Sequence, residues 1–274
     1  MDTESVARPA GGAAALLALH DAPGFVLPNA WDAGSARILE RVGFPAVATT
    51  SAGIAWARGV PDGGAMARDV MLDEVARIVA AVRVPVTADL ESGYDDVHAT
   101  VTRALEAGAV GGNLEDAAGG VLFGLDESVE RVAGARAAAP RGAFVLNART
   151  DTYLAGSAGD PFDETVERAV RYAQAGADCV FVPGVADDDT IRRLVTAIPA
   201  PLNVVAGLAS TTDAPTLFSL GVRRVSVGGS IARAALSLVE RAGRELLATG
   251  TLEFLDGALS YAETQERFSP SPAG

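Results

Sequence analysis

The stretch Leu105-Glu-Ala-Gly-Ala-Val-Gly-Gly-Asn-Leu114 joins the end of an amphipathic helix to a short apolar strand. Gly108 stands where the helix is expected to end, because glycine adopts the left-handed conformation of a helix cap at little cost. The same order of helix, glycine and apolar run returns around Gly43, Gly176 and Gly221. Apolar runs that do not alternate with polar residues are typical of strands buried on both faces of a parallel sheet. The pattern therefore indicates an α/β fold built from repeated helix–strand units.

Apolar runs of this kind are predicted as eight strands, and a helical segment follows each one. The predicted strands are Phe25–Leu27, Ala46–Thr50, Val84–Ala88, Val110–Leu114, Phe144–Ala148, Cys179–Val182, Leu202–Val205 and Val225–Val227. Eight βα units in about 230 residues are typical of a (β/α)8 TIM barrel. The alternative is an open doubly wound sheet, but no strand is followed by its GxGxxG turn. We expect one barrel domain over residues 1–274, with a core at about 25–247 and an extra C-terminal helix at about 251–268.

The composition limits the classes of partner. The chain has 274 residues, a formal net charge of −13 and 49% hydrophobic residues. An acidic surface repels phosphate backbones, so we expect neither nucleic acid nor an anionic membrane as a partner. No apolar run approaches the roughly 20 residues that a membrane helix needs. The N-terminus also lacks the basic start of a secretory signal, so a cytoplasmic protein is expected.

The residue types exclude several kinds of chemistry. All 22 basic residues are Arg and the sequence contains no Lys, which excludes a Schiff-base aldolase or a pyridoxal-phosphate enzyme. One Cys and two His leave too few ligands for a Cys/His zinc site and argue against a Ser-His-Asp triad. Cys179 lies inside an apolar run and is interpreted as a small buried hydrophobe.

Three acids are expected at neighbouring strand ends, where barrel enzymes carry their active sites. Asp89 and Glu91 follow the third predicted strand, and Glu115 follows the fourth. Residues i and i+2 of a strand point the same way, so Asp89 and Glu91 are expected to face one site. Three close carboxylates repel one another unless a cation neutralises them, and Mg2+ suits a site with few protein ligands, with Mn2+ also possible. The alternative is that these acids cap the following helices or face solvent.

An arginine and a turn are the next candidates. Arg149 ends the fifth predicted strand and could clamp a substrate carboxylate with two parallel hydrogen bonds. The alternative is an ion pair with Asp151 or Glu115. The turn Ser51-Ala52-Gly53 could offer a hydroxyl and backbone N–H groups to an anion, or be a plain turn.

Neither His is expected at the carboxyl end of a strand. Residues of other types must therefore supply the acid and base groups of the site. Tyr94, the acids, the arginines and metal-bound water remain as candidates. The loop at residues 58–68 has several glycines and one central acid, Asp62. Such a loop could close over a substrate as a lid, or be an ordinary exposed loop.

The same strand ends resemble the isocitrate lyase/phosphoenolpyruvate mutase superfamily, over about Phe25 to Leu247. The matching pieces are Leu27-Pro-Asn-Ala-Trp-Asp32, Thr49-Thr-Ser-Ala-Gly53, Thr87-Ala-Asp-Leu-Glu-Ser-Gly-Tyr94, Asn113-Leu-Glu-Asp116, Asn147-Ala-Arg-Thr-Asp151 and Pro201-Leu-Asn-Val204. The resemblance implies Mg2+-dependent cleavage or formation of C–C or P–C bonds next to a pyruvate-like or glyoxylate-like unit, through an enolate.

The resemblance also implies roles for individual residues. Asp89 would be the main metal-linked acid, and Glu91 and Glu115 would complete the metal shell. The remaining roles are substrate binding by Ser51, Ala52, Gly53, Arg149, Asn203 and Trp31, and gating by Asp62. The superfamily exchanges its eighth helix between subunits, so a homodimer or homotetramer is expected.

Two departures from the superfamily pattern narrow the function. Glu91 stands where the second acid is usually Asp. The loop after the fourth strand reads Ala117-Ala-Gly-Gly-Val-Leu-Phe-Gly124. It lacks the Lys-x-Cys-x-His pattern of the lyases and the related Lys and Asn of the mutases. A standard isocitrate or methylisocitrate lyase, or a standard phosphonomutase, is therefore not expected.

A metal ion and an oxyanion pocket are sufficient to decarboxylate a 2-oxo acid. The sequence therefore favours a Mg2+-dependent carbon–carbon lyase or decarboxylase that acts on a small 2-oxo or 2-hydroxy carboxylic acid. Two alternatives remain open: phosphoenolpyruvate or phosphonate chemistry, and a barrel that binds a metabolite without catalysis.

Overall fold

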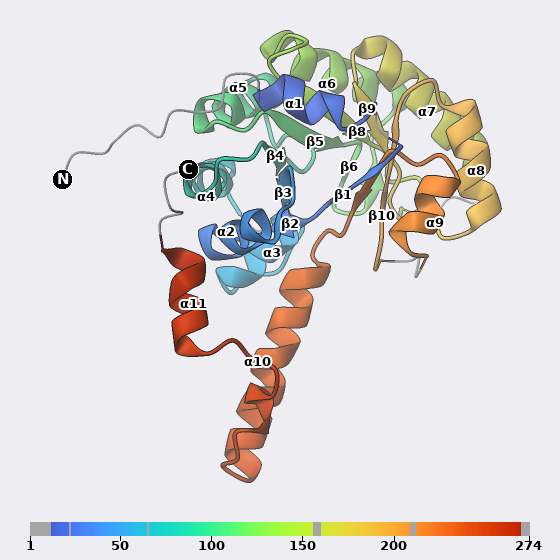
Figure 1. Ribbon diagram of the computed structural model, residues 1–274. Helices are drawn as coiled ribbons and strands as arrows, with labels where there is room; N and C mark the ends of the chain where they lie inside the picture. Colours follow the sequence, from blue (N-terminus) through green and yellow to red (C-terminus); the bar gives the residue numbers. More distant parts are fainter. Residues whose placement is uncertain (1–11, 22, 65, 156–159, 209–211, 270–274) are drawn as a thin grey trace.

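The computed structural model describes residues 12–21, 23–64, 66–155, 160–208 and 212–269 (Figure 1). Its main sheet is parallel, in the order β1-β11-β10-β9-β8-β5-β4-β3-β2. β1 (Phe25–Leu27) and β2 (Asn29–Ala30) are two parts of one strand, interrupted at Pro28, which has no N–H to donate. β1 pairs with β11 (Arg224–Ser226) and β2 pairs with β3 (Val47–Thr49), so the sheet closes into a barrel.

The other barrel strands are β4 (Val86–Asp89), β5 (Gly111–Glu115), β8 (Val145–Arg149), β9 (Cys179–Phe181) and β10 (Leu202–Val205). When β1 and β2 are counted as one strand, the barrel has eight, and each predicted strand is confirmed to within about two residues. The loop after β5 contains an unpredicted antiparallel hairpin, β6 (Ala117–Ala118) and β7 (Val121–Leu122). The (β/α)8 fold class is therefore confirmed.

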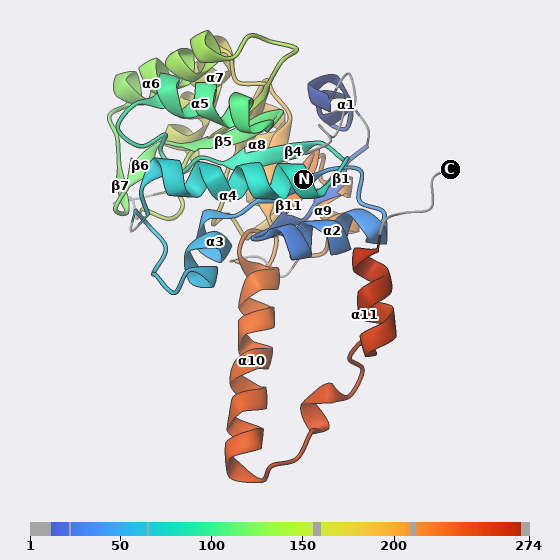
Figure 2. The same ribbon diagram turned by 90° about the vertical axis from the view of Figure 1, so that its left-hand side faces the viewer.

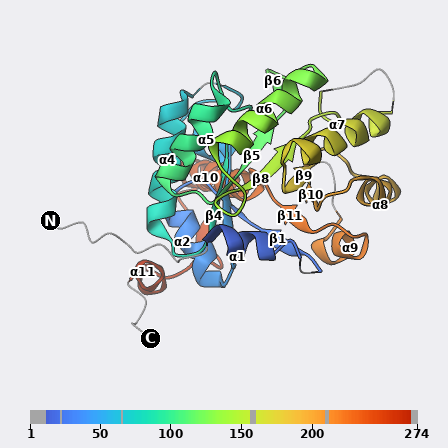
Figure 3. The ribbon, with the colours of Figure 1, turned by 90° about the horizontal axis from the view of Figure 1, so that it is seen from above.

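Helices surround the strands, as the view from above shows (Figure 3). They are α2 (Ala33–Val42), α3 (Ser51–Ala57), α4 (Arg68–Ala81), α5 (Val97–Ala107), α6 (Leu125–Ala138), α7 (Phe162–Ala175), α8 (Asp188–Ala197) and α9 (Ala214–Ser219). α2, α5 and α7 end at Gly43, Gly108 and Gly176, each in the left-handed conformation that the sequence predicted. None of the described helices has both the length and the apolar run that a membrane crossing requires.

The first helix closes the N-terminal end of the barrel. α1 (Gly12–Ala18) inserts Leu16 into a cluster that includes Phe25, Leu27 and Val145. Leu16 is fully buried, whereas its neighbour Leu17 is 38% exposed. The base of the barrel is thereby sealed from water, and the opposite end is left for a ligand.

The C-terminal segments depart from the barrel. α10 (Ser230–Ala248) projects away from it, and Ala232 is its only buried residue (Figures 1 and 2). The predicted helix at 251–268 is wrong in its first half. The segment forms a short 3-10 turn, η1 (Glu253–Leu255), and then α11 (Tyr261–Phe268), because Gly257 has a left-handed φ of 75° that interrupts a helix. α11 lies beside α2 (Figure 2).

We predict that Leu16→Ala lowers the free energy of unfolding by about 2–5 kcal/mol, because it empties a buried site at the base of the barrel. Urea unfolding followed by circular dichroism measures this change. Leu17→Ala is the matched control and should change stability by less than about 0.5 kcal/mol. Equal losses in the two variants would show that α1 does not seal the barrel.

Candidate active site

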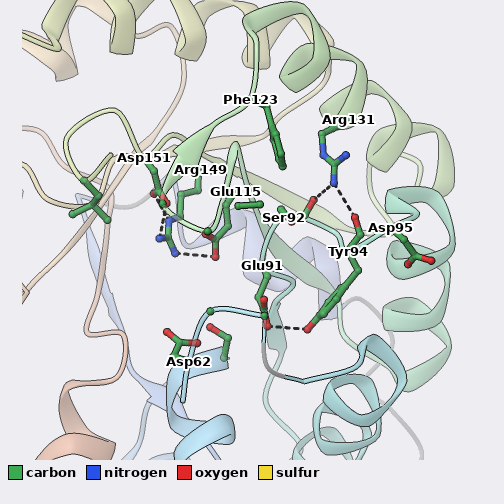
Figure 4. A pocket seen from close by; sticks show the side chains of 18 residues that line it. Asp62, Glu91, Ser92, Tyr94, Asp95, Glu115, Phe123, Arg131, Arg149 and Asp151 are labelled. Carbon is green, nitrogen blue, oxygen red and sulfur yellow. Dashed lines mark hydrogen bonds and ion pairs between the residues drawn. The ribbon is translucent and has the colours of Figure 1, made fainter. Parts of the chain in front are cut away.

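Two adjoining cavities lie at the carboxyl ends of the barrel strands. The larger has a volume of about 880 Å3 and the smaller about 420 Å3. They share four lining residues, Ser51, Asp62, Arg149 and Leu154. Figure 4 shows the acids and Arg149 gathered around the larger cavity. The two cavities therefore form one site.

Most of the predicted site residues line these cavities. They are Ser51, Ala52, Asp62, Asp89, Glu91, Tyr94, Glu115 and Arg149. Three others are not among the lining residues. Gly53 and Trp31 pack together beside the barrel, where a Cβ on Gly53 would lie 2.7 Å from the Trp31 Cβ. Asn203 is fully buried, below the cavity floor. The structure therefore places these three residues outside the linings of both cavities.

Asp89 ends β4 and is buried. Its Oδ2 accepts hydrogen bonds from both the backbone N and the hydroxyl of Ser51, each at 3.0 Å. Its backbone N donates to the Thr49 hydroxyl at 2.8 Å. Its Oδ1 is buried and has no hydrogen-bond partner among the described residues. Ser51 thus fixes one carboxylate oxygen and leaves the other for a ligand outside the chain.

Glu91 reaches the site by a different route from the one that the sequence suggested. β4 ends at Asp89, so the alternation of a strand does not apply to Glu91. Glu91 and Tyr94 instead have positive φ angles of 49° and 57°, and no other described non-glycine residue has one. Each such conformation costs about 1–3 kcal/mol and is typical of functional sites. The turn brings the Glu91 carboxylate to the Tyr94 hydroxyl, which donates to it at 3.0 Å.

Arg131 of α6 stabilises this turn from outside. Its Nη2 donates to the carbonyl oxygens of Ser92 at 2.7 Å and Tyr94 at 3.0 Å, and its guanidinium lies 4.7 Å from the centre of the Phe123 ring (Figure 4). Arg131 was not predicted from the sequence, because a long-range contact to a backbone carbonyl leaves no local pattern.

The sequence left open whether Arg149 binds a substrate carboxylate or forms an ion pair with Asp151 or Glu115. In the structure Arg149 forms both ion pairs. Its Nε and Nη2 bind the two oxygens of Asp151 at 2.6 and 2.9 Å, and its Nη1 binds Glu115 at 3.1 Å (Figure 4). These bonds occupy three of the five N–H groups of a guanidinium. One N–H on each terminal nitrogen remains for a substrate carboxylate.

Asp116 anchors the wall beside Arg149 and was also missed. Its Oδ1 accepts from the backbone N of Asp151 at 2.9 Å, and its Oδ2 accepts from Tyr172 at 2.6 Å and from Arg168 at 3.2 Å. Arg168 also donates to the Phe123 carbonyl at 3.0 Å. Asp116 therefore has a structural role at the base of the β6–β7 hairpin.

The acids of the site repel one another. Burial raises the pKa of Glu115 well above its usual value. The Arg149 guanidinium opposes this increase, whereas the charges of Asp89 and Glu91 add to it. Burial also raises the pKa of Glu91 and of Asp62, and the Asp89 charge adds to both. A bound cation would relieve this repulsion.

The residues present fit a magnesium ion that has one direct protein ligand. The described residues contain no group of three or more His, Cys, Asp or Glu placed to hold a metal together. Mg2+ characteristically keeps several water molecules and binds one or two carboxylates. Asp89 Oδ1 would be the direct ligand, and Glu91 and Glu115 would act through water.

We predict that Mg2+ raises the melting temperature of the protein, because an ion that binds only the folded chain stabilises it. Asp89→Asn should abolish this shift, since an amide oxygen carries no charge to offset dehydration of the ion. Asp73→Asn removes the same charge at an exposed position of α4 and should retain the shift. Scanning calorimetry with and without 10 mM Mg2+, roughly a saturating concentration, measures both. A shift that persists in Asp89→Asn would place the ion elsewhere.

Comparison with known proteins is consistent with this geometry. The sequence model of the family described as phosphoenolpyruvate phosphomutase matches residues 16–247. A provisionally described lyase/mutase from Burkholderia cenocepacia is 46% identical, with a TM-score of 0.88, over 94% of this chain and 96% of that one.

Two further solved structures are informative. A phosphonopyruvate hydrolase in complex with oxalate and Mg2+ is 26% identical, with a TM-score of 0.84, over 94% of this chain and 95% of that one. A 2,3-dimethylmalate lyase, described as a member of the PEP mutase/isocitrate lyase superfamily, is 25% identical, with a TM-score of 0.83, over 94% of both chains. The chain thus belongs to the phosphoenolpyruvate phosphomutase family, within the PEP mutase/isocitrate lyase superfamily.

Proposed function

We propose that the protein is a Mg2+-dependent carbon–carbon lyase or decarboxylase that acts on a small 2-oxo or 2-hydroxy carboxylic acid through an enolate. The observation that carries this proposal is the buried, unpartnered Oδ1 of Asp89 beside Arg149 at the carboxyl end of the barrel. An ion ligand and a carboxylate clamp in one cavity suit a 2-oxo acid, which offers an oxo oxygen and a carboxylate together. The similarity to a phosphonopyruvate hydrolase that binds oxalate and Mg2+ supports the same class of ligand.

A bound Mg2+ would polarise the oxo group and stabilise the negative charge of the enolate. The chain's own residues would position the substrate. Arg149, fixed by Asp151 and Glu115, would donate its two remaining N–H groups to the substrate carboxylate. Ser51 would hold Asp89 in place through Oδ2.

Proton transfer would fall to Asp62 or to solvent. Asp62 lies at the exposed rim and lines both cavities, and burial together with the Asp89 charge raises its pKa. A carboxyl with a raised pKa can give its proton to the enolate carbon. Tyr94 donates to Glu91, and its pKa is raised far above the usual value, chiefly by burial, so it stays a phenol and cannot act as a base.

The described hairpin residues after β5 that line the cavity have no proton donor in their side chains, and this suits decarboxylation. When CO2 leaves, the electrons of the broken C–C bond pass to the enolate, and no acid is required at the departing group. Among the described hairpin residues, the cavity is lined by Ala117, Ala118, Gly119, Gly120 and Phe123, none of which carries a proton donor in its side chain. A lyase reaction in which the leaving carbon or oxygen is protonated would need a proton donor at the rim of the cavity.

Two other functions remain as alternatives. Phosphonate chemistry is supported by the family that the chain belongs to. A metabolite-binding barrel without catalysis is supported by the lack of acid–base side chains in the described hairpin residues. A new P–C signal in 31P NMR with phosphoenolpyruvate would favour the first, and tight oxalate binding without turnover of any substrate would favour the second.

We predict metal-dependent release of pyruvate and CO2 from oxaloacetate, or cleavage of a member of a panel of substituted malates. Asp89→Ala should reduce kcat/KM by at least about 100-fold, because the metal supplies several kcal/mol of transition-state stabilisation. Coupled pyruvate detection with Mg2+ and with EDTA measures this loss, and circular dichroism checks that the variant is folded. Full turnover in EDTA would refute the proposal.

We also propose that the protein is a homodimer or homotetramer in which α10 packs on a neighbouring subunit. The helix leaves its own barrel with Leu236, Val239 and Leu247 exposed, and such apolar surface is typical of an interface (Figure 2). The double variant Leu236→Glu/Val239→Glu should yield monomers in light scattering coupled to gel filtration. The exposed-leucine control Leu17→Glu, on α1, should keep the wild-type mass. A monomeric wild-type protein would contradict helix exchange.

A further inference from the structure

A wholly buried guanidinium lies inside the barrel, below the acids of the site. Arg224 of β11 is 0% exposed, and none of the described residues forms an ion pair with it. Its Nη2 donates to Asn113 Oδ1 at 3.1 Å, while its Nε and Nη1 have no partner among the described residues. Burial lowers its pKa to about 10, so the group is still protonated at neutral pH. A buried charge without an ion-pair partner is costly, and the nearby Asp89 charge offsets only part of that cost.

The guanidinium and a backbone carbonyl together determine which way three buried amides point. Because a guanidinium only donates, the Asn113 atom that faces Arg224 must be the carbonyl oxygen. Asn147 Nδ2 donates to that same oxygen at 2.8 Å and to Asn203 Oδ1 at 3.1 Å. Asn203 Nδ2 donates in turn to the Ser226 hydroxyl at 3.1 Å. Asn203 Nδ2 also donates to the Val204 carbonyl oxygen at 2.7 Å, so the network is fixed at one end by a pure donor, Arg224, and at the other by a pure acceptor, the Val204 carbonyl.

This orientation turns the amide nitrogen of Asn113 toward the smaller cavity. Asn113 lines that cavity together with Asp89, Ser51 and Arg149. It is in register with Asp89 on the neighbouring strand β4, so the two side chains leave the barrel wall side by side. Asn113 Nδ2 donates no hydrogen bond to another residue in the described part of the chain, and its two N–H groups are left for a ligand.

We propose that Asn113 donates through Nδ2 to an oxygen of the bound 2-oxo acid, and that Arg224 is a positioning residue that, together with Asn147, keeps this donor turned toward the cavity. The inference rests on the proposed function, since it takes a small planar acid as the ligand. A dianionic ligand in the cavity would also add to the negative charge that Asp89 presents to Arg224. Asn113 is thereby a substrate-binding residue, and Arg224 acts through it.

The sharpest test replaces the donor without changing its shape. Asn113→Asp puts an acceptor oxygen where the N–H groups were, and gives Arg224 a carboxylate partner. We expect oxalate affinity in saturating Mg2+ to be weakened by about 10- to 100-fold, and circular dichroism checks that the variant is folded. Isothermal titration of Mg2+, then of oxalate, into the full chain measures both ligands separately. Asn113→Leu, which adds no charge, should also weaken oxalate binding.

A second set of variants tests Arg224. Arg224→Met should weaken oxalate binding by up to about 10-fold, because the Asn113 oxygen then loses one of the two donors that keep it turned away from the cavity, with Asn147 as the other. Arg224→Lys should restore most of the affinity, since an ammonium is also a pure donor and keeps the Asn113 oxygen facing it. Arg136→Lys is the matched control, a partly buried arginine that pairs with Asp178 and lines neither cavity, and it should lower the melting temperature without changing oxalate affinity.

The outcomes separate this inference from the proposed function. If wild type binds Mg2+ but not oxalate, the proposed function fails and the role of Asn113 fails with it. If wild type binds oxalate and Asn113→Asp binds it equally well, only the role of Asn113 is overturned. If Arg224→Met loses stability but keeps the wild-type oxalate affinity, Arg224 is purely structural and its positioning role is overturned.

Discussion

The site depends on the two hydrogen bonds that Ser51 donates to one oxygen of Asp89. They fix the carboxylate at the end of β4 and leave its second oxygen buried and unpartnered. The other charged groups of the cavity lie around this carboxylate. Glu91 and Glu115 bring further acidic groups, Arg149 balances part of their charge, and burial together with the Asp89 charge raises the pKa of Asp62. A site with this imbalance is prepared for a cation and for an acidic ligand that the cation and Arg149 can share.

Several features of the site lower the free energy of unfolding of the protein. The left-handed Glu91 and Tyr94 are strained, and Arg131 holds their turn by its carbonyl oxygens. Arg224 adds a buried charge below the same floor. The sealed base around Leu16 and the closed ring of strands provide the compensating burial. The rigid barrel thus supports a floor of oriented amides and a rim of acids, and the chemistry is confined to one end.

The barrel was predictable because its signals are local. Gly43, Gly108 and Gly176 end their helices as the sequence indicated, and each of the eight predicted strands lies within about two residues of a barrel strand, whereas the β6–β7 hairpin was not predicted. The acids were also found, although Glu91 reaches the site through a strained turn and not through strand alternation. Arg131, Asp116 and Arg224 were missed, because their partners lie far away in the sequence. The C-terminal helix was overextended, since its pattern does not reveal where Gly257 breaks it.

The central claim is that Asp89 Oδ1 directly binds the catalytic ion. Crystals soaked in Mn2+, which accepts the same oxygen ligands as Mg2+, allow the ion to be located by its anomalous scattering. The account predicts one strong peak at the carboxyl end of the barrel, about 2.0–2.3 Å from Asp89 Oδ1, with water between the ion and both Glu91 and Glu115. A peak bound directly by Glu91 and Glu115 and distant from Asp89, or no peak in this cavity, would contradict it.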